Sequence, residues 1–259
     1  MTNISECYEN DGFVLQRSVF SESEVSRFQE ESDRLRNDPS FINEQNLRAS
    51  TREVGKDGRI VDRLDPIVDI SSVFKDLSQD KRIHAYLRAI FGEPALLMKD
   101  KLIWKCPGAN GYGCHQDYTG WVELPAPPEA MLTVLIALDA STSDNGPIEL
   151  FPAKHQQYYL DKCAPTGLLS PTEGLVPDDI VEQWGAAEQI ALVPGDVLIF
   201  SSLAPHQSAT NFTNSYRRHI YFTYSASSCG DLYQQYYNNY RRYLSADRTA
   251  EGMIDIYFR

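Results

Sequence analysis

The spacing of apolar residues changes from a helical to a strand-like period about one third of the way along the chain. Residues 71–92 carry apolar side chains mostly three or four positions apart and end at Gly92, two positions before a proline. This is the period of an amphipathic helix, and glycine commonly follows a helix end. We therefore predict one helix over residues 71–92, with its apolar stripe at Val73, Leu77, Ile83, Leu87 and Ile90.

The residues before this helix predict a short strand, another helix and a polar connection. FVLQR at 13–17 is typical of a strand. A helix is expected after Ser21, because Glu24 three positions later completes a capping box. Residues 37–66 are polar and predict a surface loop, although their arginines could together serve an anionic ligand. These arginines are Arg48, Arg52, Arg59 and Arg63.

From residue 93 onward, short apolar segments are separated by Pro, Gly, Asn and Asp, as is typical of antiparallel strands. The expected strands are ALLMKDKLIWKC, GCHQDYTGWVEL, MLTVLIALDAS, PIELFPAKH, QIALVPGDVLIFSS and HIYFTYSAS. The tyrosine-rich residues 233–243 predict a helix that covers one sheet face. Helices followed by such a run of strands predict a mainly β, jelly-roll fold with flanking helices.

The chain length and the 42% hydrophobic content are sufficient for one sizeable core, so one domain over residues 1–259 is expected. Within it we expect a largely helical part with a loop at 1–92, a jelly-roll core at 93–228 and a helical tail at 229–259.

Charge and cysteine content narrow the range of partners and locations. The chain has 36 acidic and 24 basic side chains, which gives a formal net charge of −12. Binding to nucleic acid or to an anionic membrane depends on clustered Lys and Arg, so neither is expected as a partner. The sequence contains no run of about 18 apolar residues, so no membrane span is expected. The N-terminus does not resemble a secretion signal and the five cysteines form no CxxC pair, so we expect a cytoplasmic protein.

The segment NGYGCHQDYTGW contains the first candidate metal ligands, His115 and Asp117. In a strand, residues two apart project from the same face, so this pair would point together while Gln116 points away. Such a pair occurs by chance in many chains and needs a third ligand. Among the other histidines only His206 follows an apolar strand ending, VLIFSS, that would aim it from a rigid scaffold.

Eleven residues after His206 comes Arg217, at the start of the last long strand candidate. Two histidines and one carboxylate leave open positions on ferrous iron for a 2-oxo acid and dioxygen. An arginine can clamp the far carboxylate of that acid. Asp117, His206 and Arg217 supply the residue types that this chemistry requires.

Four segments with ordered spacing resemble the phytanoyl-CoA dioxygenase family of iron(II)/2-oxoglutarate oxygenases. They are HQD at 115–117, NGPIELFPAKH at 145–155, PGDVLIF at 194–200 and HQSATNFTNSYR at 206–217. The opening DGFVLQRSVFSESEV is also similar to the way such chains begin. The resemblance therefore covers most of the chain.

This resemblance implies a double-stranded β-helix fold with Fe²⁺ held by His115, Asp117 and His206. It also implies 2-oxoglutarate as cosubstrate, held by Arg217 and Ser208. Thr133 is a further cosubstrate candidate, at a strand position that several residue types occupy in the family.

The implied reaction uses O₂ to hydroxylate an unactivated C–H bond of a small molecule, with release of succinate and CO₂. Halogenating members of the family replace the aspartate by a small residue, so Asp117 favours oxygen transfer over chlorination. Desaturation, cyclisation and other tailoring steps in secondary metabolism stay open. Two rivals are a non-catalytic jelly-roll binding protein and a cupin-like metal enzyme without a 2-oxo acid. The joint presence of Asp117, His206 and Arg217 argues against both.

Aromatic and basic residues near the candidate metal ligands are the candidate substrate contacts. Trp121 lies four residues past Asp117 and would share its strand face, overlooking the pocket, with aromatic rings at its rim. Cations from the arginine-rich loop and from MKDKLIWK would meet an acidic substrate, while a secondary metabolite is the other option. The candidate substrate contacts are Trp121, Tyr112, Tyr118, Arg52 and Lys105.

Overall fold

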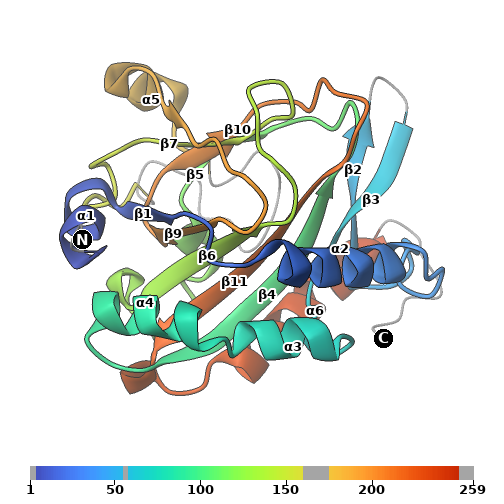
Figure 1. The fold of residues 1–259 in the computed structure, drawn as a ribbon, viewed down its shortest axis with the longest axis horizontal. Coiled ribbons are helices and arrows are strands. Elements are labelled where there is room, and N and C mark those ends of the chain that lie inside the picture. Colours follow the sequence, from blue (N-terminus) through green and yellow to red (C-terminus); the bar gives the residue numbers. More distant parts are fainter. Residues whose placement is uncertain (1–3, 55–57, 160–174, 251–259) are drawn as a thin grey trace.

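Two antiparallel sheets face each other in the computed structural model, which describes residues 4–54, 58–159 and 175–250 (Figure 1). The larger sheet has the strand order β1-β9-β6-β11-β4-β3-β2 and the smaller one has the order β5-β10-β7-β8. The strands of the larger sheet, in this order, are Phe13–Gln16, Val197–Ser201, Met131–Ala137, Arg217–Ala226, Ala95–Lys105, Gly58–Leu64 and Ala49–Val54. Those of the smaller sheet are Tyr112–His115, His206–Ser208, Ile148–Leu150 and Glu188–Gln189.

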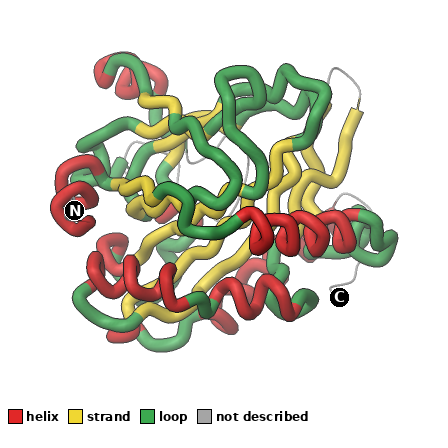
Figure 2. Tube along the Cα trace, in the orientation of Figure 1, coloured by secondary structure: helices red, strands yellow, loops and turns green. Residues whose placement is uncertain are grey.

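The central strands of the larger sheet are apolar on both faces, which explains their unbroken hydrophobic runs. Every residue of β6 and β9 is buried, and β11 pairs along its length with β4 on one side and β6 on the other. Such burial on both faces requires a second layer on each side of the sheet. Helices form one layer and the smaller sheet forms the other (Figure 2).

Helices α2 (Glu22–Arg36), α3 (Ser72–Ser78) and α4 (Lys81–Phe91) provide most of the helical layer. The predicted capping box is present, with both Ser21 and Glu24 bonded to the first turn of α2. The prediction of one helix over 71–92 was wrong, because the segment forms two helices. The carboxylate of Asp80 accepts a hydrogen bond from the backbone of Arg82 and starts a new helix there. Gly92, at φ 74°, ends α4 as predicted.

The prediction of a surface loop at residues 37–66 was also wrong, since β2 and β3 extend the larger sheet at its edge. Polar residues are typical of a loop, but here they lie on strands because the inner face of this sheet edge is itself polar. Two of the arginines are held by carboxylates, Arg48 by Asp69 and Arg52 by Asp62, at 2.8 and 2.6 Å.

Helix α6 (Tyr233–Ala250) covers the sheet beside β4, which confirms the predicted tyrosine-rich helix. Its buried tyrosines pack with Met98, Trp121 and Leu124 in a separate apolar cluster. Short helices at the ends of the sheets had no clear signal in the sequence. They are α1 (Ile4–Asp11), α5 (Asp178–Trp184), and the 3-10 turns η1 (Asp117–Gly120), η2 (Pro128–Ala130) and η4 (Ser227–Cys229).

The space between the two sheets is lined by both apolar and polar side chains. Leu135, Leu150, Leu198 and Phe200 belong to one apolar cluster, while Lys105, Arg217, His219 and Thr133 are buried polar residues of the larger sheet. In the described part of the chain, no helix has both the length and the apolar character needed to cross a membrane. The mainly β architecture with flanking helices is the predicted one, and the candidate site lies among the polar side chains between its sheets.

Candidate metal centre

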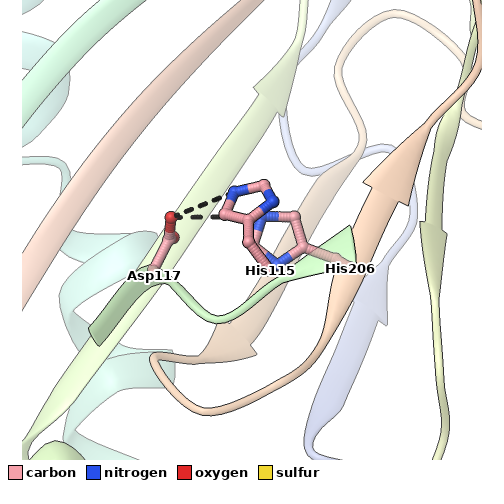
Figure 3. A group of neighbouring side chains, drawn as sticks. All are labelled: His115, Asp117 and His206. Carbon is pink, nitrogen blue, oxygen red and sulfur yellow. Dashed lines mark ion pairs between the residues drawn. The ribbon is translucent and has the colours of Figure 1, made fainter. Parts of the chain in front are cut away.

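Three side chains with metal-ligating atoms meet between the sheets: His115, Asp117 and His206 (Figure 3). His115 ends β5, His206 begins β10, and the two residues are directly paired in the smaller sheet. Asp117 Oδ1 lies 3.9 Å from His115 Nε2 and 4.0 Å from His206 Nε2. All three ligand atoms lie within 4.8 Å of one another, close enough for one ion to be placed among them at bond lengths of about 2 Å after small side-chain adjustments. The geometry therefore fits a single ion, and the predicted trio converges.

The prediction that His115, Asp117 and Trp121 share one strand was wrong. Strand β5 ends at His115, and Asp117 opens the 3-10 turn η1. Gln116 between them is still extended, at φ −112° and ψ 127°, which keeps His115 and Asp117 on one side. Gln116 itself points away as expected, and its buried amide donates hydrogen bonds to the carbonyls of Gln157 and Leu203, 2.7 Å each.

Backbone carbonyls orient both imidazole rings. Nδ1 of His115 lies 2.8 Å from the Gly113 carbonyl, and Nδ1 of His206 lies 3.0 Å from the Ala204 carbonyl. A carbonyl oxygen can only accept, so Nδ1 carries the proton in each ring and Nε2 keeps a free lone pair. In both rings this free Nε2 faces Asp117.

The protonation states of the three residues suit a divalent cation. Burial, with His206 nearby, lowers the pKa of His115 to about 4, and burial also lowers the pKa of His206. Burial by itself raises the pKa of Asp117, but His206, Lys101 and His115 outweigh this and hold it at about 2. Near neutral pH the site consists of two neutral imidazoles and one carboxylate.

Thr133 fixes the second oxygen of the carboxylate. Its hydroxyl donates a 2.9 Å hydrogen bond to Asp117 Oδ2, which leaves Oδ1 toward the histidines. Thr133 was predicted as a cosubstrate contact, and in the structure its hydroxyl is engaged with Asp117 and lies 3.3 Å from Thr223 Oγ1. Such an indirect contact orients a ligand rather than binding the metal itself.

A second polar group, formed by Lys105, Ser208 and Arg217, lies beside the metal ligands. Lys105 and Arg217 are directly opposite each other on β4 and β11. Lys105 Nζ donates to Ser208 Oγ at 2.9 Å and to the Gly146 carbonyl at 3.2 Å, and also to the carbonyl of Ala209. Arg217 donates to the same Gly146 carbonyl at 2.8 Å.

Neither cation of this group has a carboxylate partner among the described residues. Lys105 and Arg217 are 1% and 3% exposed, and Arg217 Nε has no hydrogen-bond partner. Burial, with Arg217 and Arg52 nearby, lowers the pKa of Lys105 to about 7. Two buried cations facing one carbonyl repel each other unless an anion lies between them. Lys105 was predicted as a substrate contact, and only the strand register places it opposite Arg217.

The predicted substrate contacts divide into those near the metal ligands and those away from them. The ring of Tyr112 is 6.3 Å from that of His115, and the Arg52 guanidinium stacks on Tyr112 at 3.7 Å. Tyr118 contacts Tyr158 edge to face at 5.2 Å. Trp121, 4% exposed, packs against the tyrosines of α6, because its backbone leaves the strand direction at the η1 turn.

The chain matches one family model and is similar to several named proteins. The sequence model of the family described as phytanoyl-CoA dioxygenase (PhyH) matches residues 8–219. A methylphosphonate hydroxylase of Gimesia maris is 36% identical over 168 residues, which are 63% of this chain and 58% of that protein. A 2-aminoethylphosphonate dioxygenase of an uncultured bacterium is 26% identical over 183 residues, 71% of this chain and 66% of that protein. The chain thus spans about three fifths of the length of these relatives.

Solved structures share the fold. EctD from S. alaskensis, solved with 2-oxoglutarate and 5-hydroxyectoine, superposes with a TM-score of 0.72 at 19% identity. The match covers 88% of this chain and 77% of EctD. Together with the two facing antiparallel sheets, this likeness confirms the predicted jelly-roll, or double-stranded β-helix, core.

Proposed function

The chain belongs to the phytanoyl-CoA dioxygenase (PhyH) family, and from this premise we propose that it is an iron(II)- and 2-oxoglutarate-dependent dioxygenase that hydroxylates a small molecule. The observation that carries the proposal is the trio His115, Asp117 and His206, whose ligand atoms lie within 4.8 Å of one another. Two histidines and one carboxylate occupy one face of a ferrous ion and leave its other coordination positions open. With 2-oxoglutarate and O₂, bound iron supplies the oxidising power to break an unactivated C–H bond, with release of succinate and CO₂.

The contributions of the chain itself are binding, orientation and charge. Thr133 and the two backbone carbonyls hold the ligand atoms so that they face one point. Asp117 contributes the one negative charge of the set, and its presence favours oxygen transfer over chlorination. Desaturation and ring formation require the same groups and are the alternative outcomes.

The buried group Lys105, Ser208 and Arg217 is the proposed site for the distal carboxylate of 2-oxoglutarate. Arg217 presents a free Nε and Lys105 an ammonium group, so both cations gain the counter-charge they lack. A guanidinium recognises a carboxylate with two parallel hydrogen bonds, and Ser208 Oγ adds a neutral partner. The register between β4 and β11 places the two cations directly opposite each other.

An acidic small molecule is the proposed substrate. Two relatives are named for methylphosphonate and 2-aminoethylphosphonate, both of which carry an anionic group. The inner face of β4 also presents several lysines to the space between the sheets. A secondary metabolite is the alternative substrate.

Succinate formation tests the proposal. Purified protein with Fe²⁺, 2-oxoglutarate and O₂ is expected to release succinate slowly without substrate. Asp117→Ala and His206→Ala are each expected to abolish both this activity and iron binding, whereas Asp178→Ala, an exposed carboxylate on α5, leaves both unchanged. Wild-type protein that binds neither iron nor 2-oxoglutarate contradicts the proposal.

Arg217→Ala separates the two parts of the site. We expect a higher 2-oxoglutarate requirement with iron still bound, because Arg217 does not contact the three ligand side chains in the structure. Loss of iron from this variant, with 2-oxoglutarate binding retained, means that the role assigned to Arg217 is wrong.

A further inference from the structure

Two cations on the inner face of the larger sheet, Arg63 and Lys101, lie beside the metal centre without a role in it. Lys101 is opposite Tyr221 on β11, and Tyr221 is two residues before Thr223 on the same strand. The hydroxyl of Thr223 lies 3.3 Å from that of Thr133, which is hydrogen-bonded to Asp117. Arg63 on β3 is paired with Ile103, two residues from Lys101, so both cations share one face. Lys101 is close enough to affect the pKa of all three proposed metal ligands.

The neighbouring cations on the inner face of the larger sheet, Arg52 and Lys99, each have a carboxylate partner. Arg52 forms an ion pair with Asp62 at 2.6 Å, and Lys99 lies 3.5 Å from Asp65. Asp65 also accepts a 2.9 Å hydrogen bond from Tyr237. The buried carboxylates of this edge are therefore occupied by other partners.

Arg63 and Lys101, by contrast, have no carboxylate within 4 Å in the described part of the chain. Arg63 donates a 2.9 Å hydrogen bond to Ser50, and its Nε is sealed from solvent without a partner. Among the described residues, the one direct contact of Lys101 Nζ is with the ring of Tyr221, 4.9 Å from its centroid. The carboxylates of Asp117 and Asp65 act on Lys101 only at longer range.

The charges expected in the loaded site do not neutralise this pair. The two charges of ferrous iron are balanced by Asp117 and by one carboxylate of 2-oxoglutarate. The second carboxylate of the cosubstrate lies, by the proposal above, between Lys105 and Arg217. Burial and the neighbouring Lys99 lower the pKa of Lys101 to about 8, so its positive charge is costly until a counter-charge arrives. Asp65 and Asp62 favour the charge of Arg63 from beyond 4 Å, so this guanidinium is a charged donor with a free Nε.

We propose that Arg63 and Lys101 bind the doubly charged head group of the substrate, a small phosphonate, next to the metal centre. This inference rests on the proposed function and names the substrate class and the residues that read it. A phosphonate offers three acceptor oxygens and two negative charges, which match a guanidinium donor and an ammonium donor. The phenol of Tyr112, buried beside His115 without a hydrogen bond of normal geometry, provides a further donor at the same place.

Methylphosphonate is the probe for the test. The protein loaded with Fe²⁺ and 2-oxoglutarate is titrated without oxygen by calorimetry, as wild type and as Arg63→Gln and Lys101→Met. Each variant loses one charge-assisted contact, so each is expected to weaken methylphosphonate binding by about tenfold or more. Arg59→Gln is the matched control, because Arg59 is exposed on the same strand, and its binding constant is expected to stay within about twofold of wild type.

Several outcomes overturn the inference. If methylphosphonate binds both variants as tightly as wild type, Arg63 and Lys101 do not bind its charged group. The same conclusion follows if neutral dimethyl methylphosphonate binds the wild type equally tightly. A Lys101→Met variant that loses 2-oxoglutarate affinity to the same extent places Lys101 in the cosubstrate site instead. If Arg63→Gln does not fold, Lys101→Met decides alone, since Lys101 donates no hydrogen bond among the described residues.

Succinate release without substrate separates this inference from the proposed function. Wild-type protein that forms succinate but does not bind methylphosphonate refutes the phosphonate site and leaves the oxygenase proposal intact. Protein that binds methylphosphonate through Arg63 and Lys101 but forms no succinate supports the site and refutes the oxygenase proposal.

Discussion

Replacing Lys105 by methionine tests whether two cations hold the distal carboxylate of 2-oxoglutarate. Methionine keeps most of the apolar stem of Lys105 and removes its charge and its donors to Ser208, Gly146 and Ala209. A hydrogen bond to a charged group contributes roughly 1.5–3 kcal/mol, so the dissociation constant for 2-oxoglutarate should rise roughly 10- to 150-fold. The fold should tolerate the change, because the variant also removes the repulsion between Lys105 and Arg217. We expect the free energy of unfolding to change by less than about 1.5 kcal/mol.

The pH dependence of 2-oxoglutarate binding gives this prediction a second readout. Burial and Arg217 lower the pKa of Lys105 to about 7 in the free protein, and a bound carboxylate raises it again. Below pH 7 Lys105 is protonated in both states, so affinity is constant there. Above pH 7 binding must take up a proton, and affinity falls by up to about tenfold per pH unit until the pKa of the bound state is reached. Lys105→Met should abolish this slope.

The assay is calorimetric titration of 2-oxoglutarate into iron-loaded protein without oxygen, at several pH values from 6 to about 9. Lys75→Met, which changes an exposed lysine on α3, is the matched control and should behave as wild type. The reasoning is refuted if Lys105→Met binds 2-oxoglutarate as tightly as wild type while Arg217→Ala binds it weakly. A lower melting temperature with unchanged affinity would make Lys105 a structural residue only.

Three further substitutions test the surroundings of the site. Thr133→Val removes the donor to Asp117 and should weaken iron binding about tenfold in competition with a chelator; unchanged affinity would show that this hydrogen bond does not orient the ligand. Gly146→Ala places a Cβ 2.6 Å from Lys105 Nζ at a φ of +66°, so 2-oxoglutarate binding should be lost and stability to urea should fall by about 1–3 kcal/mol. Trp121→Ala should destabilise the fold by about 3–5 kcal/mol without changing substrate preference, since the indole is in the core. An altered preference at unchanged stability would instead place Trp121 in the pocket.

Features with a local physical cause could be read from the sequence. The capping box at Ser21 and Glu24 and the helix end at Gly92 depend on neighbouring residues only, and both are present. The predicted pair His115 and Asp117 also survived, although the strand ends between them. One extended residue is enough to keep two side chains on the same side.

Predictions failed where distant residues reverse the local preference. The polar segment 37–66 looked like a loop because the sequence does not reveal that the inner sheet face at this edge is polar. Trp121 was assigned to the pocket by strand alternation, yet the η1 turn directs it to tyrosines more than a hundred residues later in the chain. Asp80 is a good helix-capping residue before Lys81 and Arg82, and it marks in the sequence the start of the second helix in residues 71–92.

Residue types and their order along the chain predicted the fold class, which the structure confirms, and three candidate metal ligands, which lie together in it. The number of histidines is small and the required chemistry accepts few alternatives, so few candidate sets were possible. The charge pattern of the site arises only in the tertiary structure. Strand register places Lys105 opposite Arg217, and Lys101 beside Arg63 on one wall, across long stretches of intervening sequence. Whether a cation is paired or free depends on which carboxylates the fold brings within about 4 Å, and no local pattern encodes that distance.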